Sequence, residues 1–338
     1  MFPKALLLRT ALNAAARVAP GPAGRAVFHL FVRPAGRSRV RPAEERLMAA
    51  ARIERIPVRG KVAVTYAWGD GRRPVLLVHG WSSRGSRLAA FAEALLDRGY
   101  SPVAFDAPGH GDAPGRATNI VEYRAIIREL HARYGDFDAV VAHSFGVIAA
   151  LFALRDGVRA GRFVGISGVG SFGLLTSWFQ GAFGMSDRAM GAMRRHVERR
   201  LAPEEPGVWE HLEADWRPED LGGPLLLIHD ESDEMVPIAH ARVLRQARPD
   251  RTRLVVTQGL GHRRILTDHQ VVAEAVEFAT AAGADRQAGT DRQAGTDRQA
   301  GTDRHAGVDQ TAGESTSSRA PSVASARSRR AMPRSARA

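Results

Sequence analysis

Three groups of polar residues follow apolar runs of the sequence and could together carry out nucleophilic chemistry. Ser144 lies in residues 141–146, between a predicted strand and a predicted helix. An acidic turn, residues 230–234, follows the apolar run 225–229, and His262 ends a Gly-Leu-Gly-His sequence after the last apolar run. A serine becomes a nucleophile when a histidine takes its proton and a carboxylate orients that histidine. These residue types, in the order serine, acid, histidine, could form a catalytic triad.

The residues around Ser144 suit a sharp turn from a strand into a helix. Such a turn needs small residues two positions before and two positions after the serine, and these are Ala142 and Gly146. Alanine adds one methyl group to the glycine that is usual at the first position, and we expect the turn to accept it. By itself this short pattern also occurs by chance, in which case Ser144 is only a small residue before a helix.

The elements around these groups alternate between strands and helices. The apolar patterns predict strands over residues 62–68, 74–79, 101–105, 138–142, 163–166, 225–229 and 254–257, and helices over residues 88–98, 121–134, 145–155, 239–247 and 271–281. This alternation indicates an α/β protein with a mostly parallel sheet covered by helices on both faces. In such sheets the chemistry lies where the strands end at their carboxyl edge.

Taken together, the motifs resemble those of the α/β-hydrolase fold family, and in particular bacterial serine esterases and lipase-like hydrolases. The resemblance spans residues 62–281 and rests on residues 79–81, 106–111, 142–146, 229–237 and 259–262. It implies the α/β-hydrolase fold with a helical lid insertion. It also implies that Ser144 is the nucleophile, Asp233 the acid and His262 the base, and that the backbone N–H groups of Trp81 and Phe145 form the oxyanion hole.

The acid has to be chosen among four acidic residues that lie in the same turn. The family motif before the acid, H-G-x-x-D-x-x-V-P, matches residues 229–237 and places the acid at Asp233, while Asp230 stands where glycine is usual. We therefore expect Asp233→Asn to lower turnover and Asp230→Asn to have little effect. The alternative is that Asp233 only caps the helix predicted after Pro237.

Other polar residues near these motifs have structural interpretations. His240 falls inside a predicted helix and His269 begins one, so we prefer His262 as the base. His143, Asp106 and His110 are expected to pack or to hold loops. The sequence contains no glycine-rich phosphate loop and no metal-binding spacing, so we expect no cofactor and no metal.

The function that the resemblance implies is a hydrolase of carboxylic esters that works through an acyl-enzyme intermediate. An acyltransferase, thioesterase, amidase or C–C hydrolase would use the same triad, and a non-catalytic binding protein of the same fold is a further alternative. Aromatic and methionine residues within 168–220 either form an apolar substrate pocket or attach the lid to the core. A small, hydrophobic acyl substrate is the expected partner, and the oligomeric state stays open.

The two ends of the chain differ from its body in charge and composition. Residues 1–43 contain eight basic and no acidic residues, residues 285–338 have a net charge of +4, and residues 44–284 are neutral, which argues against a specific nucleic-acid partner. We expect a basic helical segment over 1–56, a hydrolase domain over 57–284 and a disordered tail over 285–338, which begins with three copies of DRQAGT.

The first of these basic segments leaves two interpretations open. Phe2, Leu6, Leu7, Ala14 and Val18 could line one side of a short helix. That side would rest on anionic lipid, or the segment would form a helix pair packed on the body. The sequence has no apolar run of membrane-spanning length. We expect a cytoplasmic protein, with weak contact at the inner membrane face through its basic ends.

Overall fold

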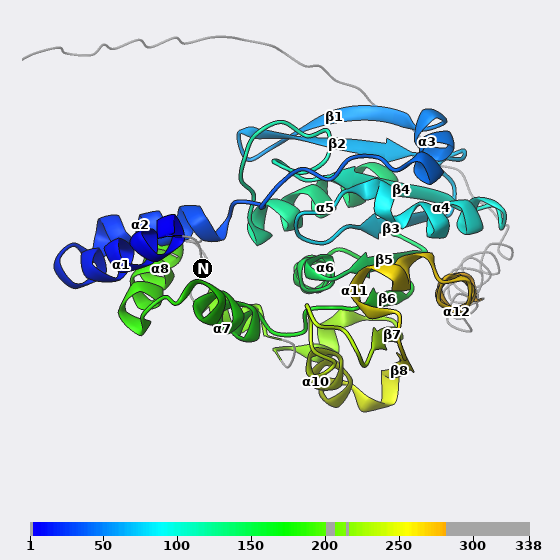
Figure 1. The fold of residues 1–338 in the computed structure, drawn as a ribbon. Helices are drawn as coiled ribbons and strands as arrows, with labels where there is room; N and C mark the ends of the chain where they lie inside the picture. Colours follow the sequence, from blue (N-terminus) through cyan, green and yellow to red (C-terminus); the bar gives the residue numbers. More distant parts are fainter. Residues whose placement is uncertain (1–2, 201–206, 214–215, 282–338) are drawn as a thin grey trace, which may run out of the picture. The chain divides into compact units, whose positions relative to one another are not determined.

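Within the residues that the computed structural model describes, 3–200, 207–213 and 216–281, eight strands form one sheet (Figure 1). Their order is β1-β2-β4-β3-β5-β6-β7-β8. β1 and β4 each pair antiparallel with β2, and all other pairs are parallel. The strands are β1 (Arg52–Val58), β2 (Lys61–Ala67), β3 (Pro74–Val78), β4 (Ser101–Asp106), β5 (Ala139–His143), β6 (Phe163–Ile166), β7 (Leu225–Asp230) and β8 (Thr252–Thr257).

Helices cover both faces of the sheet. Those described are α1 (Pro3–Val18), α2 (Pro20–Phe31), α3 (Pro42–Ala49), α4 (Ala89–Leu96), α5 (Ile120–Tyr134), α6 (Phe145–Arg155), α7 (Phe172–Phe183), α8 (Asp187–Arg200), α9 (Val208–His211), α10 (Ala239–Ala247), α11 (Gly261–Arg264) and α12 (His269–Thr280). α5, α6 and α10 pack on one face, and α3, α4 and α12 pack on the other. The predicted α/β fold is therefore confirmed.

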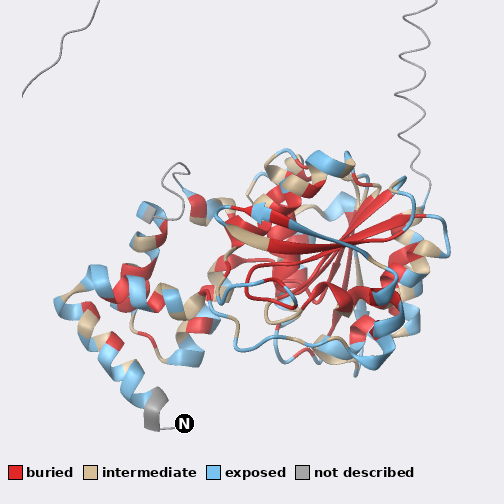
Figure 2. Cartoon of the chain, turned by 90° about the horizontal axis from the view of Figure 1, so that it is seen from above, coloured by how far each residue is buried: buried red, intermediate tan, exposed pale blue. Residues whose placement is uncertain are grey.

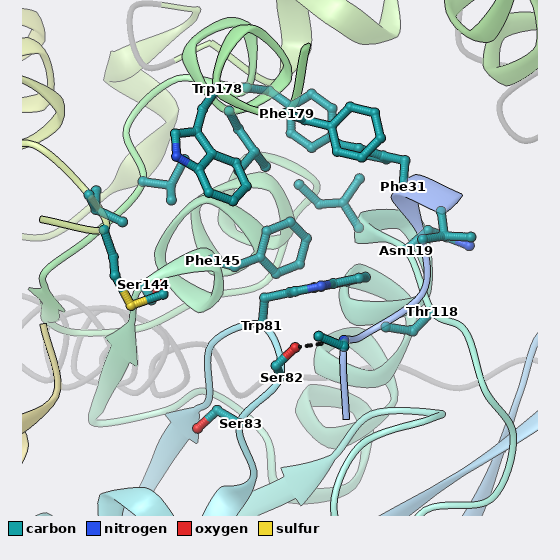
Figure 3. Close-up of a pocket in the computed structure, with 18 of the residues that line it drawn as sticks. Phe31, Trp81, Ser82, Ser83, Thr118, Asn119, Ser144, Phe145, Trp178 and Phe179 are labelled. Atoms are coloured by element: carbon teal, nitrogen blue, oxygen red, sulfur yellow. Dashed lines mark hydrogen bonds between the residues drawn. The ribbon is translucent and has the colours of Figure 1, made fainter. Parts of the chain in front are cut away.

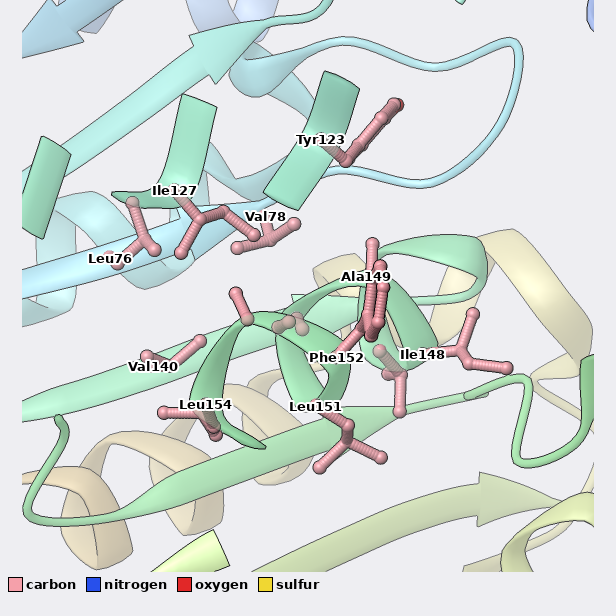
Figure 4. Packing of buried hydrophobic residues seen from close by; sticks show 14 of the residues in the cluster. Leu76, Val78, Tyr123, Ile127, Val140, Ile148, Ala149, Leu151, Phe152 and Leu154 are labelled. Atoms are coloured by element: carbon pink, nitrogen blue, oxygen red, sulfur yellow. The ribbon is translucent and has the colours of Figure 1, made fainter. Parts of the chain in front are cut away.

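Burial on both faces explains why the central strands are wholly apolar. In β3, Leu76 and Val78 face α5 and α6, while Val75 and Leu77 face α4 and α12. Figure 2 shows the central strands as buried, and Figure 4 shows Leu76 and Val78 among side chains of α5 and α6. Burying each such side chain contributes about 1.5–3 kcal/mol to the stability of the fold. The carboxyl ends of the strands are therefore held in place by a well-packed core.

No apolar pattern in the sequence predicts the first strand, β1. Its residues 52–55 are all exposed, so it has no apolar run for a pattern to detect. It pairs with β2 along its whole length as an edge strand. The sheet thus begins at Arg52, five residues before the domain boundary that the sequence suggests.

The two N-terminal helices pack against α8. Leu12 and Ala16 of α1 and Val27 of α2 are buried with methionines of α8. A side chain at Gly24 of α2 would approach the carbonyl oxygen of Ala192 to 2.2 Å, so glycine is required for this close helix contact.

The side of α1 away from this contact is apolar and faces solvent. Leu7 is 70% exposed and Val18 is 86% exposed, and Leu6 and Ala14 are exposed as well. Phe2 and the tail over 285–338 lie outside the described residues. No helix in the described part of the chain is long and apolar enough to cross a membrane.

Candidate active site

The structure brings Ser144, His262 and Asp233 together at the carboxyl edge of the sheet. They follow β5, β8 and β7 in turn. The Nε2 atom of His262 lies 3.0 Å from Oγ of Ser144, and its Nδ1 lies 2.8 Å from Oδ2 of Asp233. Because a carboxylate only accepts, Nδ1 carries the proton and Nε2 is the acceptor for the serine hydroxyl. This is the arrangement in which a histidine can take the serine proton.

Ser144 occupies a strained turn between β5 and α6. Its backbone φ of 56° lies in the left-handed region that a serine rarely adopts. The turn brings α6 directly over the end of β3, where a side chain at Gly146 would meet the carbonyl oxygen of Val78 at 2.6 Å. The predicted need for a small residue at Gly146 thus has a specific cause, which is a backbone carbonyl.

Backbone and side-chain hydrogen bonds keep Asp233 charged in a buried place. Its Oδ1 accepts from the backbone N–H groups of Met235 and Val236, each at 2.9 Å, while Oδ2 accepts from His262. Burial alone would raise the pKa of Asp233, but these hydrogen bonds outweigh it and lower the pKa to about 2. Asp233 is therefore ionised at neutral pH and points at His262.

Asp230 has a different set of partners. Its Oδ1 accepts from the backbone N–H of Ser232 at 3.0 Å, and its Oδ2 accepts from the Thr257 hydroxyl at 2.8 Å and the Leu260 backbone N–H at 2.9 Å. The carboxylate thus joins the turn that carries Asp233 to the loop that carries His262. Because of these contacts we now expect Asp230→Asn to lower the stability of the protein and, moderately, its turnover.

His143, next to Ser144, also holds the loop of His262. Its Nε2 donates to the carbonyl oxygen of His262 at 3.0 Å. Burial lowers the pKa of His143 to about 3, and the nearby His262 acts in the same direction, so His143 is neutral. It positions the backbone of His262, which gives a specific form to the structural role that the sequence suggests.

Two backbone N–H groups of the residues that line the cavity with Ser144 are without a hydrogen-bond partner in the part of the chain that is described. They belong to Trp81 and Phe145. Phe145 is the first residue of α6, whose N-terminal end favours negative charge. The rings of Trp81 and Phe145 contact each other with centroids 5.2 Å apart.

The loop that carries Trp81 is held by groups behind it. His79 donates from Nδ1 to the Gly80 carbonyl oxygen at 2.8 Å, and Nε2 of His110 accepts from the Ser82 backbone N–H at 3.0 Å. Burial lowers the pKa of His79 to about 4 and that of His110 to about 3, so both are neutral. Asp106 accepts from the Gly85 backbone N–H at 2.8 Å. Asp106 also accepts from the Asp112 backbone N–H at 2.8 Å, at the end of the Pro108-Gly109 loop that the sequence suggests it holds.

A cavity of about 740 Å³ opens beside Ser144 (Figure 3). Aromatic and leucine side chains of α7 line it, namely Phe172, Leu174, Leu175, Trp178, Phe179 and Phe183. The methionines of the same region, Met185, Met190 and Met193, instead pack with α1 and α2. The side chains of α7 thus line a cavity, while the methionines join this region to the N-terminal helices.

The sequence matches the model of the "Alpha/beta hydrolase family" over residues 75–275. The chain belongs to the alpha/beta hydrolase family. This match covers the sheet from β3 onward together with Ser144, Asp233 and His262.

Individual proteins resemble this α/β-hydrolase either over a short stretch or at low sequence identity. A non-heme chloroperoxidase from Kitasatospora aureofaciens is 31% identical over 107 residues, which are 30% of this chain and 34% of that protein. The chain thus matches about a third of the length of this curated relative.

Solved structures show the same fold over most of their length. An esterase from a Rhodococcus species is 18% identical with a TM-score of 0.51, covering 69% of this chain and all of the esterase. A monoacylglycerol lipase from Paleococcus ferrophilus is 22% identical with a TM-score of 0.50, covering 68% and 98% of the two chains.

Sequence reasoning missed that the N-terminal segment of this α/β-hydrolase reaches the site. Phe28, Leu30 and Phe31 of α2 line the cavity, and the ring of Phe31 meets that of Phe179 edge to face at 5.0 Å. The apolar run over 27–32 is the one signal in the sequence that points to a buried contact. His240, which the sequence does not favour as the base, also lines the cavity. Its Nδ1 accepts a hydrogen bond from the Gly170 backbone N–H at 3.2 Å.

Proposed function

We propose that this protein is a serine hydrolase that cleaves carboxylic esters through Ser144, His262 and Asp233. What carries the proposal is the continuous hydrogen-bonded chain from Oγ of Ser144 through His262 to Asp233. An arrangement with only a packing role would not need a strained serine aimed at the acceptor nitrogen of an oriented histidine. The alternative of a non-catalytic binding protein leaves this chain unexplained.

The proposed reaction has two halves. In the first, Oγ of Ser144 attacks the ester carbonyl carbon while Nε2 of His262 takes the hydroxyl proton, and the backbone N–H groups of Trp81 and Phe145 bind the oxyanion. His262 then gives the proton to the leaving alcohol, which leaves an acyl group on Ser144. In the second half, His262 takes a proton from water, the hydroxide attacks the acyl carbon, and the acid departs as Oγ regains a proton.

Each supporting residue has a stated part in this scheme. Asp233 holds the Nδ1 proton of His262 and stabilises the positive charge that His262 carries midway. A single oxyanion donor is typically worth about 10²–10³ in rate. The apolar wall of α7 suits the acyl chain of the substrate, because it removes apolar surface from water. We therefore propose a hydrophobic acyl ester as the substrate class, with α7–α9 as a lid over the site.

Labelling with a fluorophosphonate tests the proposal without knowledge of the substrate. This probe phosphonylates an activated serine, so we expect the wild-type protein to be labelled and Ser144→Ala to be unlabelled. Ser83→Ala is the matched control, because Ser83 lines the same cavity outside the hydrogen-bonded chain. Equal labelling of wild type and Ser144→Ala, or a folded wild-type protein that stays unlabelled and hydrolyses no aryl ester, would contradict the proposal.

A further inference from the structure

The cavity beside Ser144 has a strongly basic rim. Five arginines line it, namely Arg33, Arg37, Arg41, Arg87 and Arg263, and no Asp or Glu of the described part of the chain does. The remainder of the lining is mostly apolar, with the aromatic residues of α2 and α7 at its centre. A cavity for a neutral ester would not need this excess of one sign of charge.

Three of these arginines lie on one segment, residues 32–41, which we call the basic strap. Its start is held where the Thr118 backbone N–H donates to the Val32 carbonyl oxygen at 3.1 Å. Next, the Ala35 backbone N–H donates to Oγ of Ser82 at 3.2 Å, a contact drawn in Figure 3. Because Ser82 follows Trp81, the basic strap lies against the loop of the proposed oxyanion hole.

Two of the five arginines are committed to holding this arrangement. Arg87 is paired with Glu44 and donates to Oγ of Ser38 and the carbonyl oxygen of Arg39, each at 2.7 Å. Arg37 donates to backbone carbonyl oxygens of the loop over 111–115, including that of Ala113 at 2.6 Å. These contacts fix the basic strap in place before any substrate binds.

The side chains of the other three arginines are not used in contacts of this kind. Arg33, Arg41 and Arg263 are exposed at the rim, and within the described residues they have neither an ion pair nor a side-chain hydrogen bond. Arg263 directly follows His262, while Arg33 and Arg41 stand at either end of the basic strap. The rim of the cavity thus presents three unpaired cations around an apolar interior.

We propose that the natural substrate is an amphiphilic acyl ester or thioester whose molecule also carries a carboxylate or phosphate, and that Arg33, Arg41 and Arg263 bind this anionic group. This inference rests on the proposed function. A guanidinium matches the paired oxygens of either anion and can bind them through two hydrogen bonds. A concave surface lined by one sign of charge also raises the local concentration of oppositely charged substrate.

The test compares esters that differ in one charge. para-Nitrophenyl octanoate is paired with the mono-para-nitrophenyl ester of octanedioic acid, which places the charge on the acyl side. Methyl para-(octanoyloxy)benzoate is paired with para-(octanoyloxy)benzoate, which places it on the leaving side. The readout is the ratio of kcat/KM for the anionic ester to that for the neutral ester, because differences in leaving-group reactivity cancel when this ratio is compared between variants.

The variants are Arg33→Gln/Arg41→Gln and Arg263→Gln, with Arg55→Gln/Arg245→Gln as the matched control. Arg55 and Arg245 are exposed and lie outside the cavity lining, so the control removes two positive charges without touching the rim. We expect the ratio to fall about tenfold in Arg33→Gln/Arg41→Gln for at least one pair of esters, and to stay within about twofold in the control. For the wild type, the ratio should also fall as salt screens the rim.

Two outcomes would overturn the inference. One is a ratio that is the same in wild type, rim variants and control at low salt. The other is seen with Ser144→Ala, which binds without turnover: equal affinity for octyl phosphate and octanol would mean that the rim selects no anion. Because this binding test needs no catalysis, it remains decisive if the esterase proposal itself fails, whereas absent labelling and absent hydrolysis refute only the proposed function.

Discussion

Asp230→Asn is the substitution for which the structure makes the sharpest new prediction. The carboxylate accepts three hydrogen bonds, from Ser232 on Oδ1 and from Thr257 and Leu260 on Oδ2. An asparagine offers one acceptor oxygen and one NH₂ group. If the oxygen keeps Thr257 and Leu260, the NH₂ group faces the N–H of Ser232, so two donors meet where a charge-assisted bond existed.

The cost follows from this count. Losing one hydrogen bond to a charged group and leaving a buried donor without an acceptor lowers the free energy of unfolding by about 2–3 kcal/mol. In a domain of this size, 1 kcal/mol shifts the midpoint of thermal unfolding by about 2–4 °C, so we expect Tm to fall by about 4–12 °C. Turnover should fall moderately, since Leu260 belongs to the loop that carries His262.

The assay measures Tm by differential scanning calorimetry and kcat for an aryl ester in Asp230→Asn and Asp233→Asn. For Asp233→Asn we expect a smaller change in Tm and a larger loss of kcat. The loss is up to about 10⁴-fold, because asparagine favours the wrong tautomer of His262. An unchanged Tm in Asp230→Asn would refute the argument from its three hydrogen bonds. A larger loss of kcat in Asp230→Asn than in Asp233→Asn, at equal Tm, would mean that Asp230 is the acid.

Two further predictions concern pH and the N-terminal helix. His79, His110, His143 and His240 have pKa values lowered by burial from 6.5 to about 3–4, so the unfolded chain binds protons that the folded chain does not. Stability should therefore be complete above about pH 6.5 and fall as the pH drops toward about 4, by up to about 1.4 kcal/mol per pH unit for each histidine. Equal urea midpoints at about pH 7 and about pH 5 would contradict this. Leu7→Gln/Val18→Gln, on the exposed side of α1, should weaken sedimentation with vesicles of anionic phospholipid, and unchanged sedimentation would argue against lipid contact there.

Local rules explain what the sequence by itself determined. A buried strand must be apolar on both faces, so the runs at β3, β5 and β7 were visible without a structure. The small residues two positions before and two positions after Ser144 were visible as a local pattern, although the carbonyl oxygen that requires Gly146 belongs to Val78 of another strand. The resemblance to the α/β-hydrolase family, carried by the motifs around Ser144, Asp233 and His262, selected the three residues that the structure brings together.

What only the tertiary structure decided depends on contacts between residues far apart in the chain. His143 bonds to the backbone of His262 across 119 positions, and Asn13 of α1 bonds to Gly184 across 171. No local pattern encodes such a pair, because each partner is an ordinary polar residue or backbone group until the fold closes the distance. For the same reason the basic strap looked like part of a charged terminus. Its position against Ser82, which makes it a wall of the cavity, follows from hydrogen bonds that exist only in the folded chain.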